Sequence, residues 1–153
     1  MKKFYHYTPE FKLQTIIDSG EIKLATKSVG HKKEKPVAWV SSNEFWEHTA
    51  TKMAFIDGNI KQLTFEEQLR DIGCARIEVC STGIMSWAKL IHKAKMNPFI
   101  ASIMEEKGIQ MGGKPSEWYG SLNAIKKKNW SRAEVFRNGE WVLFESFQSI
   151  EAL

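Results

Sequence analysis

The 153-residue sequence lacks the features that define several classes of protein. No apolar run approaches the roughly 18 to 20 residues of a membrane helix, and the Met-Lys-Lys-Phe start leads into a polar stretch rather than an apolar signal core. We therefore expect a cytoplasmic protein without a membrane segment. Repeats and low-complexity segments are also missing, and an apolar fraction of 42% predicts a folded chain.

Cysteines and phosphate-binding motifs are equally scarce. Cys74 and Cys80 lie six residues apart on one predicted strand, where they share a face but are too distant for a disulfide. Without a C-x-x-C pair, neither a zinc site nor a disulfide framework is favoured. The sequence contains no G-x-x-x-x-G-K-[ST] or G-x-G-x-x-G loop. We expect a site without a metal.

Positive charge is present but unevenly distributed. The formal net charge is +4, and two basic clusters lie at 31–35 and 126–128. Either cluster could contact a phosphate backbone, although charge runs of this kind are more often solvated surface loops. We take Lys32 and Lys33 as candidate contacts to a nucleic acid or an acidic protein.

The alternation of patterns predicts one α+β domain over residues 1–153. Thr8 and Pro9 suit the cap and first position of a helix, and Thr64 with Glu67 forms a capping-box pattern. Residues 111–120 are predicted as a loop that leads into a short helical turn. The expected strands are 3–7, 21–25, 37–42 and 74–81, and the expected helices are 9–19, 42–54, 64–72, 87–96 and 98–107.

A β-hairpin is predicted at 132–145. Asn138-Gly139 supplies the two positive φ angles of a tight turn between alternating strands. Arg137 then opposes Glu140, which predicts a cross-strand salt bridge worth a few tenths of a kcal/mol. On the first of these strands, Glu134 shares a face with Arg132 and Phe136.

The stretch FYHYT at 4–8 places a histidine and a threonine in the opening strand. Because alternate residues share a face, His6 and Thr8 project together while Tyr5 and Tyr7 project oppositely. A lone strand histidine is more often a packed or surface residue than a ligand contact. The order of the later motifs changes that balance.

Four segments follow one another in a specific order: HYT at 6–8, IIDSG at 16–20, VAWVSS at 37–42, and RAEVF at 132–136. This order resembles the ADP-ribosyltransferase superfamily, in the branch with a histidine on the first core strand. That branch includes the poly(ADP-ribose) polymerases and the diphtheria-toxin-like enzymes. The N-terminal segment is also similar to that of DNA-modifying bacterial toxins of the same superfamily. The resemblance covers roughly the first 55 residues well and the last 25 loosely.

The resemblance implies a split β-sheet core and NAD as a substrate. Cleavage of the bond between nicotinamide and ribose passes through an oxocarbenium-like state, which a carboxylate stabilises. Glu134 is expected in that catalytic role, with His6 and Thr8 holding the ribose and the amide by hydrogen bonds. The further residues expected to bind NAD are Tyr7, Trp39, Ser41 and Trp46.

The chain departs from the family pattern at two places. Tyr7 stands where the family has glycine, and an aromatic residue that would stack on nicotinamide is not obvious after the middle strand, where Phe45 or Trp46 is the nearest substitute. Trp118 and Tyr119 are either an aromatic platform for a base or nicotinamide, or a loop anchor. Glu145 is the second choice for the catalytic carboxylate.

Glu47 and His48 could also touch a ligand, but as residues of a predicted helix surface they need no function. Three functions follow from the sequence. The preferred one is a mono-ADP-ribosyltransferase that modifies a nucleic acid or protein. The second is an RNA 2′-phosphotransferase, which needs a set of arginines, whereas this chain has four. The third is a non-catalytic binding module of the same fold.

Overall fold

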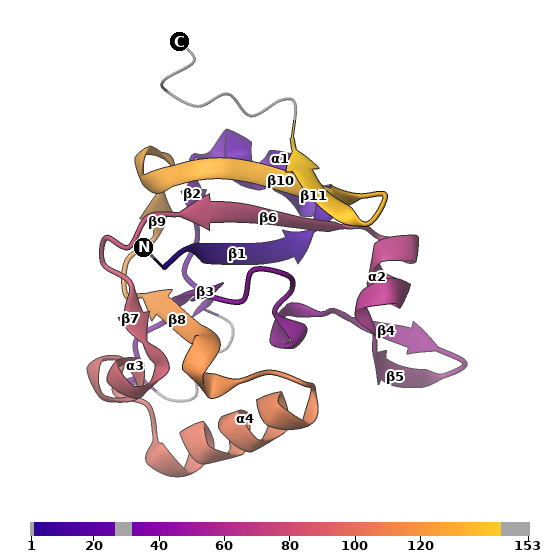
Figure 1. Cartoon of the computed structure of the whole chain (residues 1–153). Coiled ribbons are helices and arrows are strands. Elements are labelled where there is room, and N and C mark those ends of the chain that lie inside the picture. The colour runs from indigo at the N-terminus through magenta and orange to yellow at the C-terminus, as the bar shows by residue number, and fades with distance from the viewer. Residues whose placement is uncertain (1, 27–31, 145–153) are drawn as a thin grey trace.

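A large antiparallel sheet forms the centre of the protein (Figure 1). This computed structural model describes residues 2–26 and 32–144. The strands are β1 Phe4–Pro9, β2 Glu21–Ile22, β3 Ala38–Ser41, β4 Met53–Ile56, β5 Asn59–Gln62, β6 Cys74–Val79, β7 Met85–Ser86, β8 Trp118–Ser121, β9 Ile125–Lys126, β10 Trp130–Arg137 and β11 Glu140–Leu143. The α-helices are α1 Glu10–Ser19, α2 Phe65–Asp71, α3 Trp87–Lys93 and α4 Pro98–Gln110.

The sheet joins segments that are distant in the sequence. Its order is β11-β10-β6-β1-β3-β8-β7, and its neighbouring strands are antiparallel. Two further two-stranded sheets pair β2 with β9 and β4 with β5. The β4–β5 hairpin projects from the body beside α2 (Figure 1). The prediction of mixed α and β structure is confirmed.

One face of the sheet packs against α1. Leu13 and Ile17 of that helix are buried, and they join a cluster of apolar side chains from the central strands. Burial of each such side chain stabilises the fold by about 1.5–3 kcal/mol. The strand residues in this cluster include Phe4, Ala75, Ile77, Val79, Ala133 and Val135.

The opposite face carries a cluster of aromatic rings. Tyr7 packs edge-on against Trp46 at a centroid distance of 5.0 Å, and Phe65 packs edge-on against Phe136 at 5.2 Å. Trp141 of β11 lies against the same cluster. The two sheet faces therefore have different chemistry, aliphatic against α1 and aromatic on the other side.

A third apolar cluster joins α3 and α4 to the β3–β8–β7 end of the sheet. It contains Val37, Trp87, Leu90, Ala94, Met96, Ala101 and Trp118. Helix α4 approaches closely at Gly108, where a Cβ atom would lie 2.5 Å from Cη2 of Trp118. Only a residue without a side chain permits this contact.

The predicted helix over 42–54 is wrong. The side-chain oxygen of Asn43 accepts hydrogen bonds from the backbone N–H groups of Phe45 (2.8 Å) and Trp46 (3.1 Å), which closes a turn. Such local bonds compete with helix formation. The segment then contains a single 3₁₀ turn, His48–Ala50, and continues into β4.

Thr8 does not cap α1, because β1 continues through Pro9 and the helix begins at Glu10. The predicted loop over 111–120 contains a 3₁₀ turn, Pro115–Glu117, and then enters β8, which the sequence analysis did not predict. The expected strand over 21–25 is limited to β2, and the helix expected to end at 107 continues to Gln110.

Local motifs with a well-defined geometry are confirmed. The reciprocal capping box of Thr64 and Glu67 begins α2, and Arg137 opposes Glu140 across the hairpin turn. The predicted ion pair between these two hairpin residues is wrong, however. Arg137 instead pairs with Glu10 of α1, at 2.6 Å, and so fixes the hairpin to the helix.

No helix within residues 2–26 and 32–144 has the length and apolar character needed to cross a membrane.

Replacing Gly108 by alanine tests the contact between α4 and the sheet. The added methyl group must displace the Trp118 ring, so Gly108→Ala should lower the free energy of unfolding by about 1–3 kcal/mol. The exposed α4 substitution Ser102→Ala serves as the control and should change it by less than about 0.5 kcal/mol. Urea unfolding measures both; equal stability of the two variants would contradict the close contact.

Candidate functional site

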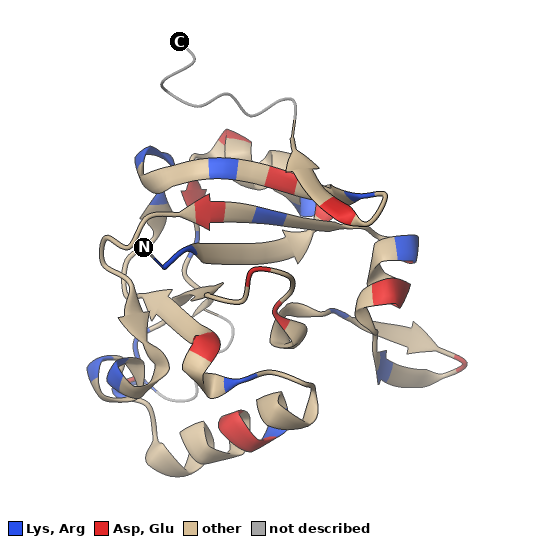
Figure 2. Cartoon of the chain, viewed as in Figure 1, with Lys and Arg blue, Asp and Glu red and all other residues tan. Residues whose placement is uncertain are grey.

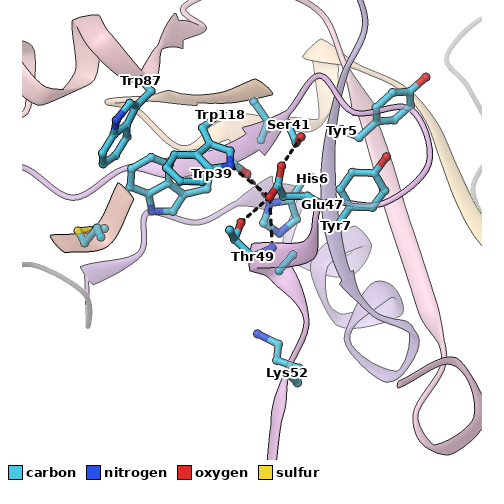
Figure 3. Close-up of a pocket in the computed structure, with 13 residues that line it drawn as sticks. Tyr5, His6, Tyr7, Trp39, Ser41, Glu47, Thr49, Lys52, Trp87 and Trp118 are labelled. Carbon is cyan, nitrogen blue, oxygen red and sulfur yellow. Dashed lines mark hydrogen bonds between the residues drawn. The ribbon is translucent and has the colours of Figure 1, made fainter. Parts of the chain in front are cut away.

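A cavity lies where β1 and β3 separate. Within the described residues, β1 and β3 pair at Tyr5 and Ser41, and the two strands diverge beyond this pair. The cavity has a volume of about 350 Å³. Figure 3 shows its lining: Tyr5, His6, Tyr7, Trp39, Val40, Ser41, Glu47, Thr49, Ala50, Lys52, Trp87, Met104 and Trp118.

Three tryptophans form one wall of the cavity. Trp39 comes from β3, Trp87 begins α3, and Trp118 begins β8. The rings of Trp39 and Trp87 lie 6.0 Å apart, and Trp87 meets Trp118 edge-on at 5.4 Å. Such a wall offers flat apolar surface to a planar aromatic ligand.

Trp87 also carries an unsatisfied polar atom. Its indole N–H is buried and has no hydrogen-bond partner within the described part of the chain. A buried donor without a partner costs about 1–3 kcal/mol, and such groups call for a specific explanation. A bound water or a ligand acceptor would remove this cost.

Glu47 places a buried carboxylate beside the aromatic wall. Ser41 Oγ donates to Oε1 at 2.8 Å, and Oε2 accepts from Thr49 Oγ1 at 2.8 Å and Trp118 Nε1 at 3.2 Å. The backbone N–H of Thr49 donates to the same oxygen at 3.2 Å. These four donors offset the cost of removing the carboxylate from water. Figure 3 shows that they converge from β3, β8 and the 3₁₀ turn.

His6 presents a neutral imidazole to the cavity. Its Nδ1 lies 2.8 Å from the carbonyl oxygen of Trp39. Because a carbonyl only accepts, Nδ1 carries the proton, and Nε2 keeps a lone pair that can accept from a ligand. Burial lowers the pKa of His6 below its ordinary value of 6.5; the Trp39 bond opposes this shift, and the positive charges of Lys52 and Lys12 add to it.

Lys52 supplies positive charge at the cavity. It is the one lysine or arginine among the described lining residues, and Figure 3 shows it set apart from the aromatic wall. Burial, with a smaller effect of Lys12, lowers the pKa of Lys52 from 10.5. An ammonium group in this position can pair with an anionic ligand group such as a phosphate.

The structure brings five of the sequence-predicted site residues to the cavity: His6, Tyr7, Trp39, Ser41 and Trp118. Thr8 and Trp46 are buried but do not line it, and the Trp46 indole donates instead to Thr51 Oγ1 at 2.9 Å.

Tyr119 packs against Phe4, with ring centroids 4.8 Å apart, and does not line the cavity. Lys32 and Lys33 are exposed and do not line it either. Glu145 lies outside the described residues.

Glu134 lies on the other face of the sheet from His6. In the strand register Tyr7 is opposite Arg76, and Arg76 is opposite Glu134, so these three side chains share a face from which His6 points away. Glu134 is buried and pairs with Arg76 at 2.8 Å and with Arg132 at 3.2 Å. The cavity is lined by Tyr7 as well as by His6, but Glu134 is not among its lining residues, so the structure does not bring Glu134 together with His6.

Arg76 explains why Glu134 is buried. Its guanidinium group lies between the rings of Tyr5 and Trp141, at 4.1 and 4.4 Å from their centroids. It also donates to the backbone carbonyl of Glu44. Glu134 thus completes an ion pair that supports the loop leading to Glu47.

Eight of the thirteen lining residues were not in the sequence-predicted site, among them Glu47, Thr49, Lys52 and Trp87; of these, only Glu47 had been considered as a residue that could touch a ligand. Glu47 was assigned to a helix surface because the spacing of 42–54 fits a helix. The sequence contains one indication against that helix, since Asn43 directly after a strand favours a side-chain turn. Trp87 was assigned to a helix correctly, but no local pattern indicates which cavity it borders.

Among the described residues, no three histidine, cysteine, aspartate or glutamate side chains lie together as ligands of a metal ion would. Comparisons with protein-family models, with curated proteins and with solved structures each found no match to the chain.

Replacing Glu134 by glutamine tests whether this residue is structural. The change leaves the Arg76 charge buried without its partner, and removing one member of a buried pair costs about 3–5 kcal/mol. Glu134→Gln should therefore lower the free energy of unfolding strongly, whereas the exposed Glu140→Gln should leave it nearly unchanged. Similar midpoints for the two variants in urea would show that the Arg76 pair contributes little.

The lowered pKa of His6 predicts a pH dependence of stability. Below pH 6.5 the unfolded chain binds a proton at His6 that the folded protein resists, so stability falls as the pH decreases from 6.5 towards the folded pKa. The His6→Gln variant should lose part of this dependence. Melting temperatures between pH 7.5 and pH 5.5 measure it, and parallel curves for wild type and variant would contradict the assignment.

Proposed function

We propose that the protein binds NAD in the cavity between β1 and β3 and transfers ADP-ribose to a macromolecular acceptor. The observation that carries the proposal is the meeting of a neutral histidine, a wall of three tryptophans and a buried carboxylate in one cavity. These groups come from β1, β3, α3, β8 and the segment after β3. Nucleic acid or protein is the acceptor class.

The order of motifs along the chain supports the same proposal. The strand that resembles the first motif of the ADP-ribosyltransferases contains His6, and the cavity lies at the edge of that strand where the sheet opens. An ADP-ribosyltransferase-like split sheet is the finer fold that we propose for the arrangement of β1, β3 and β8.

Nicotinamide fits the chemistry of the lining. Its planar ring would stack on the tryptophan wall, and His6 Nε2 would accept a hydrogen bond from an amide N–H or a ribose hydroxyl. The volume of about 350 Å³ is at the lower end of the range for ligand pockets, about 300–1,000 Å³. It suits the nicotinamide end of NAD, while Lys52 lies where an emerging phosphate group would be stabilised.

Glu47 replaces Glu134 as the candidate catalytic carboxylate. When the bond between ribose C1′ and the nicotinamide nitrogen breaks, its electron pair leaves with nicotinamide and positive charge develops on the ribose. A nucleophilic atom of the acceptor then forms a bond to C1′ and releases its proton to solvent. A fixed negative charge nearby stabilises the positively charged state most when it is already oriented. The four hydrogen bonds to Glu47 provide this orientation, so its role is electrostatic rather than proton transfer.

A binding module without catalysis is the second candidate. Two observations favour it: the Glu47 carboxylate already accepts four hydrogen bonds, and Tyr7 stands where the resemblance leads one to expect glycine. The RNA 2′-phosphotransferase receives no support, because none of the four arginines lines the cavity. Each of them pairs with a carboxylate elsewhere.

Titration with NAD tests the proposal. Quenching of tryptophan fluorescence reports occupation of the wall, and chromatography of the mixture reports released nicotinamide. Glu47→Gln should slow nicotinamide release by about 100-fold or more, since it removes the charge beside the developing cation. Glu140→Gln is the control, an exposed carboxylate that does not line the cavity, and should leave the rate unchanged.

The outcomes separate the candidates. Binding of NAD without release of nicotinamide in the wild type selects the binding module. Absence of NAD binding, or equal loss of release in both variants at a temperature where both are folded, contradicts the proposed site.

A further inference from the structure

Lysines gather on one surface around α3. Lys32, Lys33 and Lys35 precede β3, and Lys89, Lys93 and Lys95 lie on α3 or directly after it; we call these six residues the α3 basic surface. All six are exposed. Glu34 is the one acidic residue within 32–35 and 87–95, so the two segments carry a net charge of +5, more than the +4 of the entire chain. Figure 2 shows the blue bands along α3.

The fold holds the two segments together. The backbone N–H of Lys35 donates to the carbonyl of Ala94 at the end of α3, at 2.8 Å. Val37 packs against the buried residues Leu90 and Ala94 of the same cluster. Two charge clusters that are more than 50 residues apart in the sequence therefore form one surface, which no local sequence pattern indicates.

The ammonium groups of Lys89 and Lys93 on α3 are not neutralised by an acidic side chain of the described residues. Lys89 and Lys93 are four residues apart, so they share a helix face and repel each other. In the part of the chain that the structure describes, neither ammonium group forms an ion pair. An external polyanion is the partner that this arrangement fits.

The α3 basic surface borders the cavity. Trp87, the first residue of α3, belongs to the tryptophan wall. A small depression lined by Glu34 and Lys35 shares Trp39 and Met104 with the lining of the main cavity. A polymer bound along the lysines would thus pass directly beside the half-buried ring of Trp39.

We propose that the α3 basic surface binds the phosphate backbone of single-stranded nucleic acid. Lysines supply sequence-independent contacts to phosphates, and an aromatic ring beside them stacks on an unpaired base. A duplex keeps its bases paired and away from such a ring. An acidic peptide would use the charges but leave the aromatic contact unexplained. The inference that the bound nucleic acid accepts ADP-ribose rests on the proposed function. The inference that it binds to the α3 basic surface does not.

Fluorescence anisotropy of the full chain, without NAD, tests the surface. The probe is a labelled single strand of about 15 nucleotides, DNA or RNA, titrated over a range of salt concentrations. Lys89→Glu/Lys93→Glu should weaken binding at least tenfold and reduce the slope of log affinity against log salt by about 1.4, the loss of two phosphate contacts to a single strand. The neutral variant Lys89→Gln/Lys93→Gln should also weaken binding, but by a smaller factor.

The matched control uses the second basic cluster, on another part of the surface. Lys127→Glu/Lys128→Glu makes the same change of charge and should leave affinity nearly unchanged. Equal weakening by both charge reversals would overturn the proposal, as would competition by poly-glutamate as effective as by the single strand, or tighter binding of the duplex.

The experiment is independent of the NAD titration. If the single-stranded probe binds but nicotinamide is never released, the proposal for the α3 basic surface is supported and the proposed function is contradicted. If nicotinamide is released but Lys89→Glu/Lys93→Glu binds the strand like wild type, the surface is wrong and the proposed function stands.

Discussion

The site depends on one buried carboxylate. Glu47 cannot be removed from water without donors, and it obtains them from three segments: Ser41 at the end of β3, Thr49 in the 3₁₀ turn, and Trp118 on β8. Satisfying this single group fixes the path of the chain after β3 and orients one ring of the tryptophan wall. The opening between β1 and β3 is therefore defined by hydrogen bonding as well as by apolar packing.

Two further contacts support this carboxylate. On the sheet face that carries Tyr7, Arg76 donates to the carbonyl of Glu44, and Glu134 neutralises Arg76. At the other end of the cavity, Gly108 of α4 packs against Trp118 and limits where that indole can lie. Glu134 thus acts on the site as part of its scaffold. It is buried, charged and ion-paired, as a catalytic residue often is, but it pairs with Arg76 and Arg132 and does not line the cavity.

Local patterns predicted much of the fold, and long-range pairing limited the prediction of the site. The Asn138-Gly139 turn and the Thr64 capping box depend on neighbouring residues, and the sequence identifies both. Alternation correctly separates His6 from Tyr7 within β1. Which face of β10 matches which face of β1 depends on their common neighbour β6, and no local pattern contains that register. Glu47 was misassigned because helical spacing outweighed one turn-forming asparagine.

The most direct test of this account is a crystal structure of the protein soaked with NAD. We expect nicotinamide between β1 and β3, with its ring against Trp39, Trp87 or Trp118, a hydrogen bond to His6 Nε2, and the ribose close to the Glu47 carboxylate. Density for NAD beside Glu134 instead of in this cavity, or a cavity that stays empty at saturating NAD, would contradict it.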